Sequence, residues 1–211
     1  MTGDDLSYLR KILDSKEIGG PVLEVGSRIS GEGSAGSCSE VIEKHGLQYY
    51  GADLKKGKNV DFVADFSKEK QVSSLNRKFN IIIIFNVLEH TFNPIQVLDN
   101  SITLLEDKGI LICTTPTIWP LHEWPIDTYR INPQFYMKYA KKRGLKLEYL
   151  HYLGYGQVYN YKDEKEEIEY PPPTKSKLKL FWSRAIHKIA NTYARSHHAP
   201  SHLSTGAVLR K

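Results

Sequence analysis

The sequence predicts an α/β protein built on an open, mostly parallel sheet with helices on both faces. Strand-like and helix-like segments alternate along most of the 211 residues, which is the pattern of a doubly wound sheet. Four successive isoleucines, Ile81 to Ile84, show no polar alternation, which is typical of a parallel strand buried on both faces. Predicted strands end at Gly26, Asp53 and Asp65, and ligands bind at the carboxyl ends of strands in such sheets.

Helical spacing and glycine turns define the elements of the first half of the chain. Leu6, Leu9 and Ile12 recur on one helical face and place a helix near the N-terminus. Gly46 stands where a second helix should end, as glycine commonly does after a helix C-terminus. The expected elements are helix 4–17, strand 22–25, helix 34–45, strand 48–52, strand 60–64 and helix 67–78.

Asparagine–proline pairs begin the helices of the second half. Pro94 and Pro133 each follow an asparagine, and proline suits the first helical turn because the N–H there needs no helical acceptor. Gly109 and Gly144 stand where these helices give way to strands. The expected elements are strand 79–85, helix 93–108, strand 110–114, helix 133–143, strand 146–153 and strand 203–209.

Composition indicates one folded domain over residues 1–211. The chain is 40% hydrophobic and 25% charged, which excludes wholesale disorder. Its longest unbroken apolar run, residues 81–85, is too short to cross a membrane, and the N-terminus lacks the pattern of a secretory signal. The two cysteines fit neither a disulfide framework nor a zinc pattern, so we expect a cytoplasmic protein.

Residues 156–201 are expected to form an insertion between the last two strands. Residues 170–211 contain eight Lys and Arg and no Asp or Glu, so the net charge of +5 belongs to this end of the chain. A basic amphipathic helix there can lie on an anionic membrane surface, or it can cover the ligand cleft of the sheet or pack on a partner subunit. We favour the second role, a cover or a subunit contact. The apolar stripe is Leu178, Trp182, Ala185, Ile189 and Tyr193.

The predicted strand ends carry the residue types of a nucleotide site. Gly26 and Gly31 allow a ligand to approach the backbone of the turn that precedes a helix N-terminus. Asp53, roughly 20 to 30 residues further on, suits the hydroxyls of a ribose. Asp65 and Phe66 offer an acid and an aromatic ring to an adenine. The alternative is that these residues merely end strands, but their order in one chain favours a ligand site.

Four stretches resemble the class I S-adenosylmethionine-dependent methyltransferases. They are VLEVG at 22–26, YYGAD at 49–53, DF at 65–66 and NVLEH at 86–90. The V-L-E-H in the last stretch resembles a motif of the small-molecule branch of this family. The resemblance covers residues 20–155 and 206–211. It implies a Rossmann-like seven-stranded sheet with an antiparallel last strand, and S-adenosyl-L-methionine as cofactor. The glycine loop departs from the family pattern because its middle glycine is missing.

The resemblance also implies which residues meet the cofactor. The methionine part would lie against the loop after the first strand of the sheet and the end of the isoleucine strand, with the ribose and adenine beyond. The residues implied are Glu24, Gly26 and Asn86 at the methionine, Asp53 at the ribose, Asp65 and Phe66 at the adenine, and Ser27 and Gly31 as further cofactor-binding residues.

The methyl acceptor is expected beside Glu89 and His90. Histidine can act as a base near neutral pH, although His90 could instead cap or pack against the next helix. The loop from 120 to 130 resembles the H-x-x-P-x-D-x-x-R loop of methyltransferases found with bacterial glycan synthesis. It offers a further catalytic candidate and four substrate-binding candidates: His122, and Trp124, Asp127, Tyr129 and Arg130. The alternative is a structural loop in which Arg130 pairs with Asp127.

These residues favour O-methylation of a sugar or another small polar acceptor. The alternatives are a protein or RNA methyltransferase that docks through its basic tail, and a non-catalytic cofactor-binding scaffold. DNA is not expected, because NVLE at 86–89 differs from the Asn/Asp-Pro-Pro-Tyr motif of amino-methylating DNA enzymes. His122, Glu123 and Asp127 could bind a metal, but no helical His/Glu spacing supports one, so no metal site is expected.

Overall fold

The computed structural model contains a seven-stranded sheet with the order β3-β2-β1-β4-β5-β7-β6. The structure describes residues 2–16, 18–29, 36–119, 121–122, 126–153 and 203–211. β7 runs antiparallel to β5 and β6, and the remaining neighbours pair in parallel. The predicted fold is therefore confirmed, including its antiparallel last strand. Among the described helices, none is long and apolar enough to span a membrane.

The elements follow one another in the predicted order. The strands are β1 (Val22–Val25), β2 (Tyr49–Asp53), β3 (Phe62–Val63), β4 (Phe79–Phe85), β5 (Leu105–Ile118), β6 (Lys146–Leu153) and β7 (Leu203–Arg210). The helices are α1 (Gly3–Asp14), α2 (Cys38–Lys44), α3 (Glu69–Ser73), α4 (Pro94–Thr103) and α5 (Pro133–Arg143), with a short 3-10 helix at Leu88–His90.

Several element boundaries differ from the prediction, among them the following three. The helix expected over 93–108 ends at Thr103, and β5 begins two residues later because Leu105 pairs with Phe79 of β4. β5 is also much longer than the expected strand 110–114, because β7 pairs with it as far as Ile118. α3 is shorter than the expected helix 67–78, since Asn76 has a φ of +44° and cannot continue a right-handed helix.

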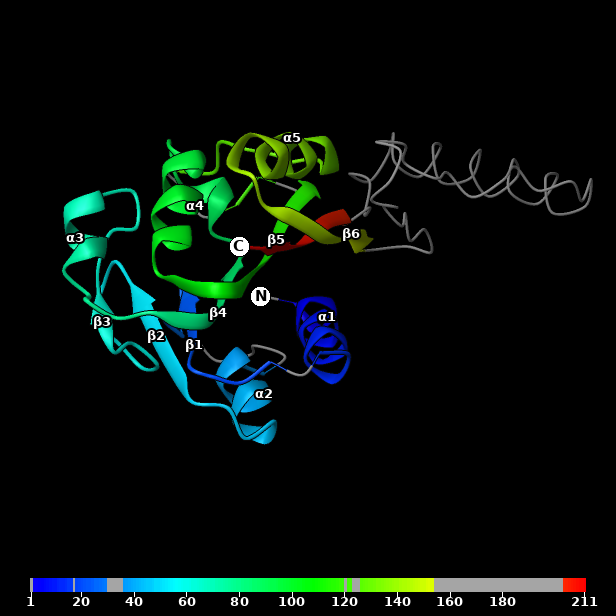
Figure 1. Cartoon of the computed structure of the whole chain (residues 1–211). Coiled ribbons are helices and arrows are strands. Elements are labelled where there is room, and N and C mark those ends of the chain that lie inside the picture. Colours follow the sequence, from blue (N-terminus) through cyan, green and yellow to red (C-terminus); the bar gives the residue numbers. More distant parts are fainter. Residues whose placement is uncertain (1, 17, 30–35, 120, 123–125, 154–202) are drawn as a thin grey trace, which may run out of the picture.

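Both faces of the sheet are buried by helices, as the isoleucine run predicted. Ile82 and Ile84 lie in the core cluster shared with α3, α4 and α5, whereas Ile81 and Ile83 lie in the one shared with α1 and α2. Figure 1 shows α1 and α2 on one side of the sheet and α4 and α5 on the other. All four isoleucine side chains are fully buried, and burying each contributes roughly 1.5–3 kcal/mol. This rigid β4 positions the residues that follow it.

β6 and β7 pair directly, on either side of the expected insertion 156–201. The insertion and its amphipathic stripe lie outside the described residues. Its role on a membrane, over the cleft or at a subunit contact remains a prediction, as does the cytoplasmic location.

Candidate active site

The turn after β1 lies close to the chain that follows β4. Gly26 has a φ of +83°, and a Cβ placed there would lie 2.4 Å from Cγ2 of Val87. The N–H groups of Gly26 and Ser27 donate to the carbonyl of Ala52 at 2.8 and 3.1 Å. A residue with a side chain would strain this backbone and collide with Val87. Glycine is therefore required where the ends of β1, β2 and β4 meet.

Two polar side chains near this turn form hydrogen bonds within the protein. Glu24 is buried in β1 and accepts a hydrogen bond of 2.6 Å from the hydroxyl of Tyr49, and burial raises the pKa of its carboxyl. Ser27 is also buried, and its hydroxyl donates to the carbonyl of Asn59 at 2.7 Å. Both side chains hold the β1–β2 edge in shape. Gly31 lies outside the described residues.

Asp53 ends β2 with its carboxylate held at the same edge. Its Oδ2 accepts from the N–H of Arg28 at 3.2 Å, and its Oδ1 accepts from the N–H of Lys55 at 3.1 Å. Two backbone N–H groups orient the carboxylate and the guanidinium of Arg28 lies 3.8 Å from Oδ1, while further lone pairs remain for the hydroxyls of a ligand. Asp53 therefore lies at a strand end, as expected, and its contact with a ribose remains a prediction.

Asp65 and Phe66 follow β3 as expected, but their side chains have internal contacts. Oδ1 of Asp65 accepts from the N–H and hydroxyl of Ser67 at 2.8 and 2.6 Å. The ring of Phe66 is buried in the core, and its carbonyl accepts from the side-chain amide of Asn100 at 2.7 Å. Phe66 thus supports this end of the sheet from within.

Asn86 follows β4 in a left-handed conformation, with a φ of +53°. Its side-chain amide donates to Oδ2 of Asp5 at 2.8 Å, and the same oxygen accepts from the N–H of Thr2 at 2.7 Å. α1 is thereby attached to the end of β4. Sequence reasoning missed Asp5, although Thr2 and Asp5 have the spacing of a capping box.

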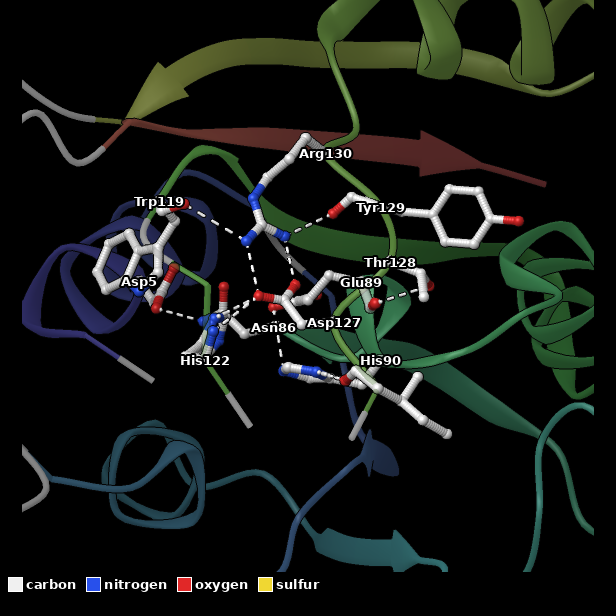
Figure 2. Close-up of polar contacts among 11 residues, drawn as sticks. Asp5, Asn86, Glu89, His90, Trp119, His122, Asp127, Thr128, Tyr129 and Arg130 are labelled. Carbon is white, nitrogen blue, oxygen red and sulfur yellow. Dashed lines mark hydrogen bonds and ion pairs between the residues drawn. The ribbon is translucent and has the colours of Figure 1, made fainter. Parts of the chain in front are cut away.

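Glu89, His90 and His122 meet beside Asn86, from two separate segments (Figure 2). Glu89 and His90 lie on the 3-10 helix after β4, and His122 comes from the loop after β5. One ligand-capable atom of each lies within 4.8 Å of the other two. The His90 and His122 ring centroids are 4.9 Å apart, and His90 Nε2 is 3.7 Å from Glu89 Oε1.

Glu89 is the most unusual member of this cluster. Its side chain is fully buried, and neither carboxylate oxygen has a hydrogen-bond partner among the described residues. Burial raises the pKa of Glu89 to about 8, because a charged carboxylate is poorly solvated there. Buried polar groups are nearly always partnered, so this carboxyl group indicates a functional site.

The two imidazoles are oriented by hydrogen bonds from their Nδ1 atoms. His90 Nδ1 lies 2.8 Å from the carbonyl of Ile126, and His122 Nδ1 lies 3.0 Å from Oδ2 of Asp127. A carbonyl and a carboxylate can only accept, so each Nδ1 donates, and in the neutral form of each ring the lone pair is on Nε2.

Asp127 and Arg130 form an ion pair through both guanidinium NH groups, in which Arg130 Nη2 donates to Asp127 Oδ2 at 2.7 Å. Arg130 also donates to the carbonyls of Tyr129 and Trp119. Hydrogen bonding from Arg130 holds the pKa of Asp127 well below its usual range. This favours the structural alternative for Asp127 and Arg130, whose pairing shapes the loop around His122.

The remaining loop residues differ in position. The hydroxyl of Tyr129 donates to the carbonyl of Phe92 at 3.2 Å, at the exposed surface of the loop. The N–H of Thr128 donates to the carbonyl of Glu89 at 2.9 Å, so the loop is bound to the 3-10 helix. Trp124 and Glu123 lie outside the described residues.

Replacing Asp127 with asparagine is expected to lower turnover at least about tenfold while cofactor affinity stays near the wild-type value. The amide cannot pair with Arg130 or hold His122 as the carboxylate does, and the loss of stability should be about 1–3 kcal/mol. Steady-state kinetics and thermal unfolding measure both effects. Asp99→Asn breaks a comparable but more exposed pair with Arg143 and is the matched control. Equal effects of the two variants on turnover would contradict a role of Asp127 at the site.

A family model described as a methyltransferase domain matches residues 5–190, and the chain belongs to this family. None of the curated proteins compared with the chain matches it. An S-adenosylmethionine-dependent methyltransferase from Archaeoglobus fulgidus is 13% identical with a TM-score of 0.59, over 98% of this chain and 93% of that one. Coclaurine N-methyltransferase, bound to N-methylheliamine and S-adenosylhomocysteine, is 12% identical with a TM-score of 0.56, over 98% and 72%.

The protein is thus an S-adenosylmethionine-dependent methyltransferase. The residues at the carboxyl edge of the sheet fit this cofactor. Gly26 allows the left-handed backbone of the turn, and Asp53 presents a carboxylate beside it. A third structural neighbour, the [4+2]-cyclase SpnF, is 14% identical with a TM-score of 0.58, over 99% of this chain and 81% of that one. The fold therefore does not by itself define the acceptor.

Proposed function

We propose that the protein methylates a hydroxyl oxygen of a small polar acceptor such as a sugar. The observation that carries this proposal is the cluster of Glu89, His90 and His122 next to Asn86, the residue expected at the methionine part of the cofactor. The bound cofactor supplies an electrophilic methyl group. The chain's own residues must bind the acceptor, align its oxygen and deal with its proton.

The proton favours oxygen over nitrogen as the methylated atom. A neutral amine has its lone pair available before it reacts, whereas a hydroxyl must lose its proton as the new C–O bond forms. In their neutral forms His90 and His122 have the lone pair on Nε2, because each Nδ1 donates a hydrogen bond. His90 would receive the hydroxyl proton as the acceptor oxygen takes the methyl group that the cofactor supplies.

The surroundings of the cluster favour a polar ring as acceptor. The ring centroids of Trp119 and His122 are 6.3 Å apart, so an aromatic ring lies beside the cluster. Aromatic surfaces together with polar groups are suited to the two kinds of face that a sugar presents. This loop also carries the resemblance to methyltransferases of glycan synthesis.

Transfer of a ¹³C-labelled methyl group tests the proposal. The protein would be incubated with [methyl-¹³C]S-adenosylmethionine and a panel of sugars, nucleotide sugars, phenols and amines. We expect label in an O-methyl group, recognised by its carbon chemical shift, and much less label with Glu89→Gln. Label found on nitrogen or carbon of the best acceptor would contradict hydroxyl methylation.

A further inference from the structure

The donor atoms of Glu89, His90 and His122 match the preferences of a transition-metal ion. Two imidazole nitrogens and one carboxylate oxygen suit Zn²⁺, Fe²⁺, Co²⁺ or Mn²⁺, whereas Mg²⁺ and Ca²⁺ favour oxygen ligands alone. Three protein ligands leave open positions for water or a substrate oxygen. Sequence reasoning considered His122 with Glu123 and Asp127, but Asp127 is committed to Arg130.

The hydrogen bonds around the two histidines are those of metal-binding imidazoles. Such histidines donate their second ring N–H to a carbonyl or a carboxylate, which fixes the tautomer and the ring. His90 does so to the carbonyl of Ile126 and His122 to the carboxylate of Asp127. Asp127 is in turn fixed by Arg130. The structure thus contains the supporting contacts of a metal site as well as the donor residues.

The buried carboxyl group of Glu89 is an independent indication of a cation. It is fully buried, and neither oxygen has a hydrogen-bond partner among the described residues. A carboxyl group buried without a partner loses its hydration, and a bound cation is one of the few groups that compensates for this loss. His90 Nε2, at 3.7 Å, is the nearby basic atom.

We propose that Glu89, His90 and His122 bind a divalent transition-metal ion at the acceptor side of the active site. Ligand atoms about 2.0–2.1 Å from one tetrahedral ion are about 3.4 Å apart, so the present separations of up to 4.8 Å must shorten. His122 lies on a loop and its side chain is 31% exposed, so it can approach the other two without disturbing the sheet.

A catalytic role of the ion rests on the proposed function, O-methylation. Binding of the ion to the three residues does not depend on that function. An acceptor hydroxyl on the open position would lose its proton more easily, because a bound divalent ion lowers the pKa of the oxygen that it holds. The proton then passes to water, the oxygen bonds to the methyl carbon, and the C–S bond breaks. The two imidazoles act as ligands in this arrangement, and His90 is no longer the base.

Cobalt binding to the full-length, chelator-treated protein tests the site. We expect one equivalent of Co²⁺ to produce visible d–d absorption, with displacement by Zn²⁺. Glu89→Gln and His122→Ala should each weaken Co²⁺ binding by at least about 10-fold. Glu89→Gln keeps the shape of the buried side chain, and His122→Ala changes only the loop, so at least one variant should remain folded, as circular dichroism will show.

Two control variants decide where the ion binds. His45→Ala removes a partly exposed histidine that pairs with Asp14, away from the cluster, and should bind Co²⁺ like the wild type. The double variant His197→Ala/His198→Ala removes two histidines that are adjacent in the sequence of the insertion. It should also bind Co²⁺ like the wild type. Absence of a cobalt spectrum, unchanged affinity in both cluster variants, or loss of binding only in a control variant would overturn the proposal.

Activity separates this proposal from the proposed function. Methylation of a hydroxyl that continues at full rate in the chelator-treated protein would overturn the role of the metal and leave O-methylation intact. Co²⁺ binding that depends on the cluster, together with label transferred to an amine, would contradict O-methylation and leave the metal site intact.

Discussion

Glu89→Gln is expected to lower turnover by about 100-fold or more while S-adenosylmethionine affinity stays near the wild-type value. Glutamine has the shape of glutamate but cannot become a carboxylate, which the proposed metal site requires as a ligand. Because the carboxyl group is buried without a partner, the substitution should leave the free energy of unfolding unchanged or raise it. Steady-state kinetics, calorimetry and denaturant unfolding measure the three quantities.

Glu148→Gln is the control for this result. Glu148 pairs with Lys16 and Arg210 near the start of β6, at the opposite end of the sheet. Its loss should cost about 1 kcal/mol of stability and leave turnover unchanged. Wild-type turnover in Glu89→Gln would show that the buried carboxyl group takes no part in methyl transfer.

Gly26→Ala should abolish measurable cofactor binding, with a loss of at least about 100-fold. The left-handed backbone costs alanine about 1–2 kcal/mol, and its Cβ would meet Val87 at 2.4 Å. Either the β1 turn or the chain after β4 must move, and both line the expected methionine site. Titration calorimetry measures the affinity, and circular dichroism reports whether the sheet persists.

Gly46→Ala separates backbone strain from this collision. Gly46 has a φ of +70°, and a Cβ there would meet nothing within 4 Å. The control should therefore lose about 1 kcal/mol of stability and keep its cofactor affinity. Similar cofactor affinity in both variants would show that the Gly26 turn is not part of the cofactor site.

The elements that the sequence predicted well are those set by local chemistry. The isoleucine run defined β4, and the Asn132–Pro133 pair defined the start of α5, where the Asn132 side chain accepts from the N–H of Phe135. The extent of β5 was missed because it depends on pairing with β7, about 90 residues later in the chain. No local pattern reports such a pairing.

The site was predictable in its residue types and only partly in its contacts. Asp53 and Asn86 lie at strand ends, as the pattern indicated. The contact of Asn86 with Asp5 joins positions 81 residues apart, and the approach of His122 to Glu89 depends on a loop shaped by the Asp127–Arg130 pair. The proposed metal site depends on this loop, so helical His/Glu spacing could neither predict nor exclude it.

Titration of the protein with S-adenosylmethionine tests the central claim most directly. The account predicts saturable 1:1 binding of the cofactor and of S-adenosylhomocysteine. Asp53→Ala should weaken both by about 1–3 kcal/mol, because the carboxylate held by Arg28 and Lys55 is the expected partner of the ribose hydroxyls. Absence of any binding heat from the wild-type protein at millimolar ligand would contradict the assignment of this sheet edge as a methyltransferase cofactor site.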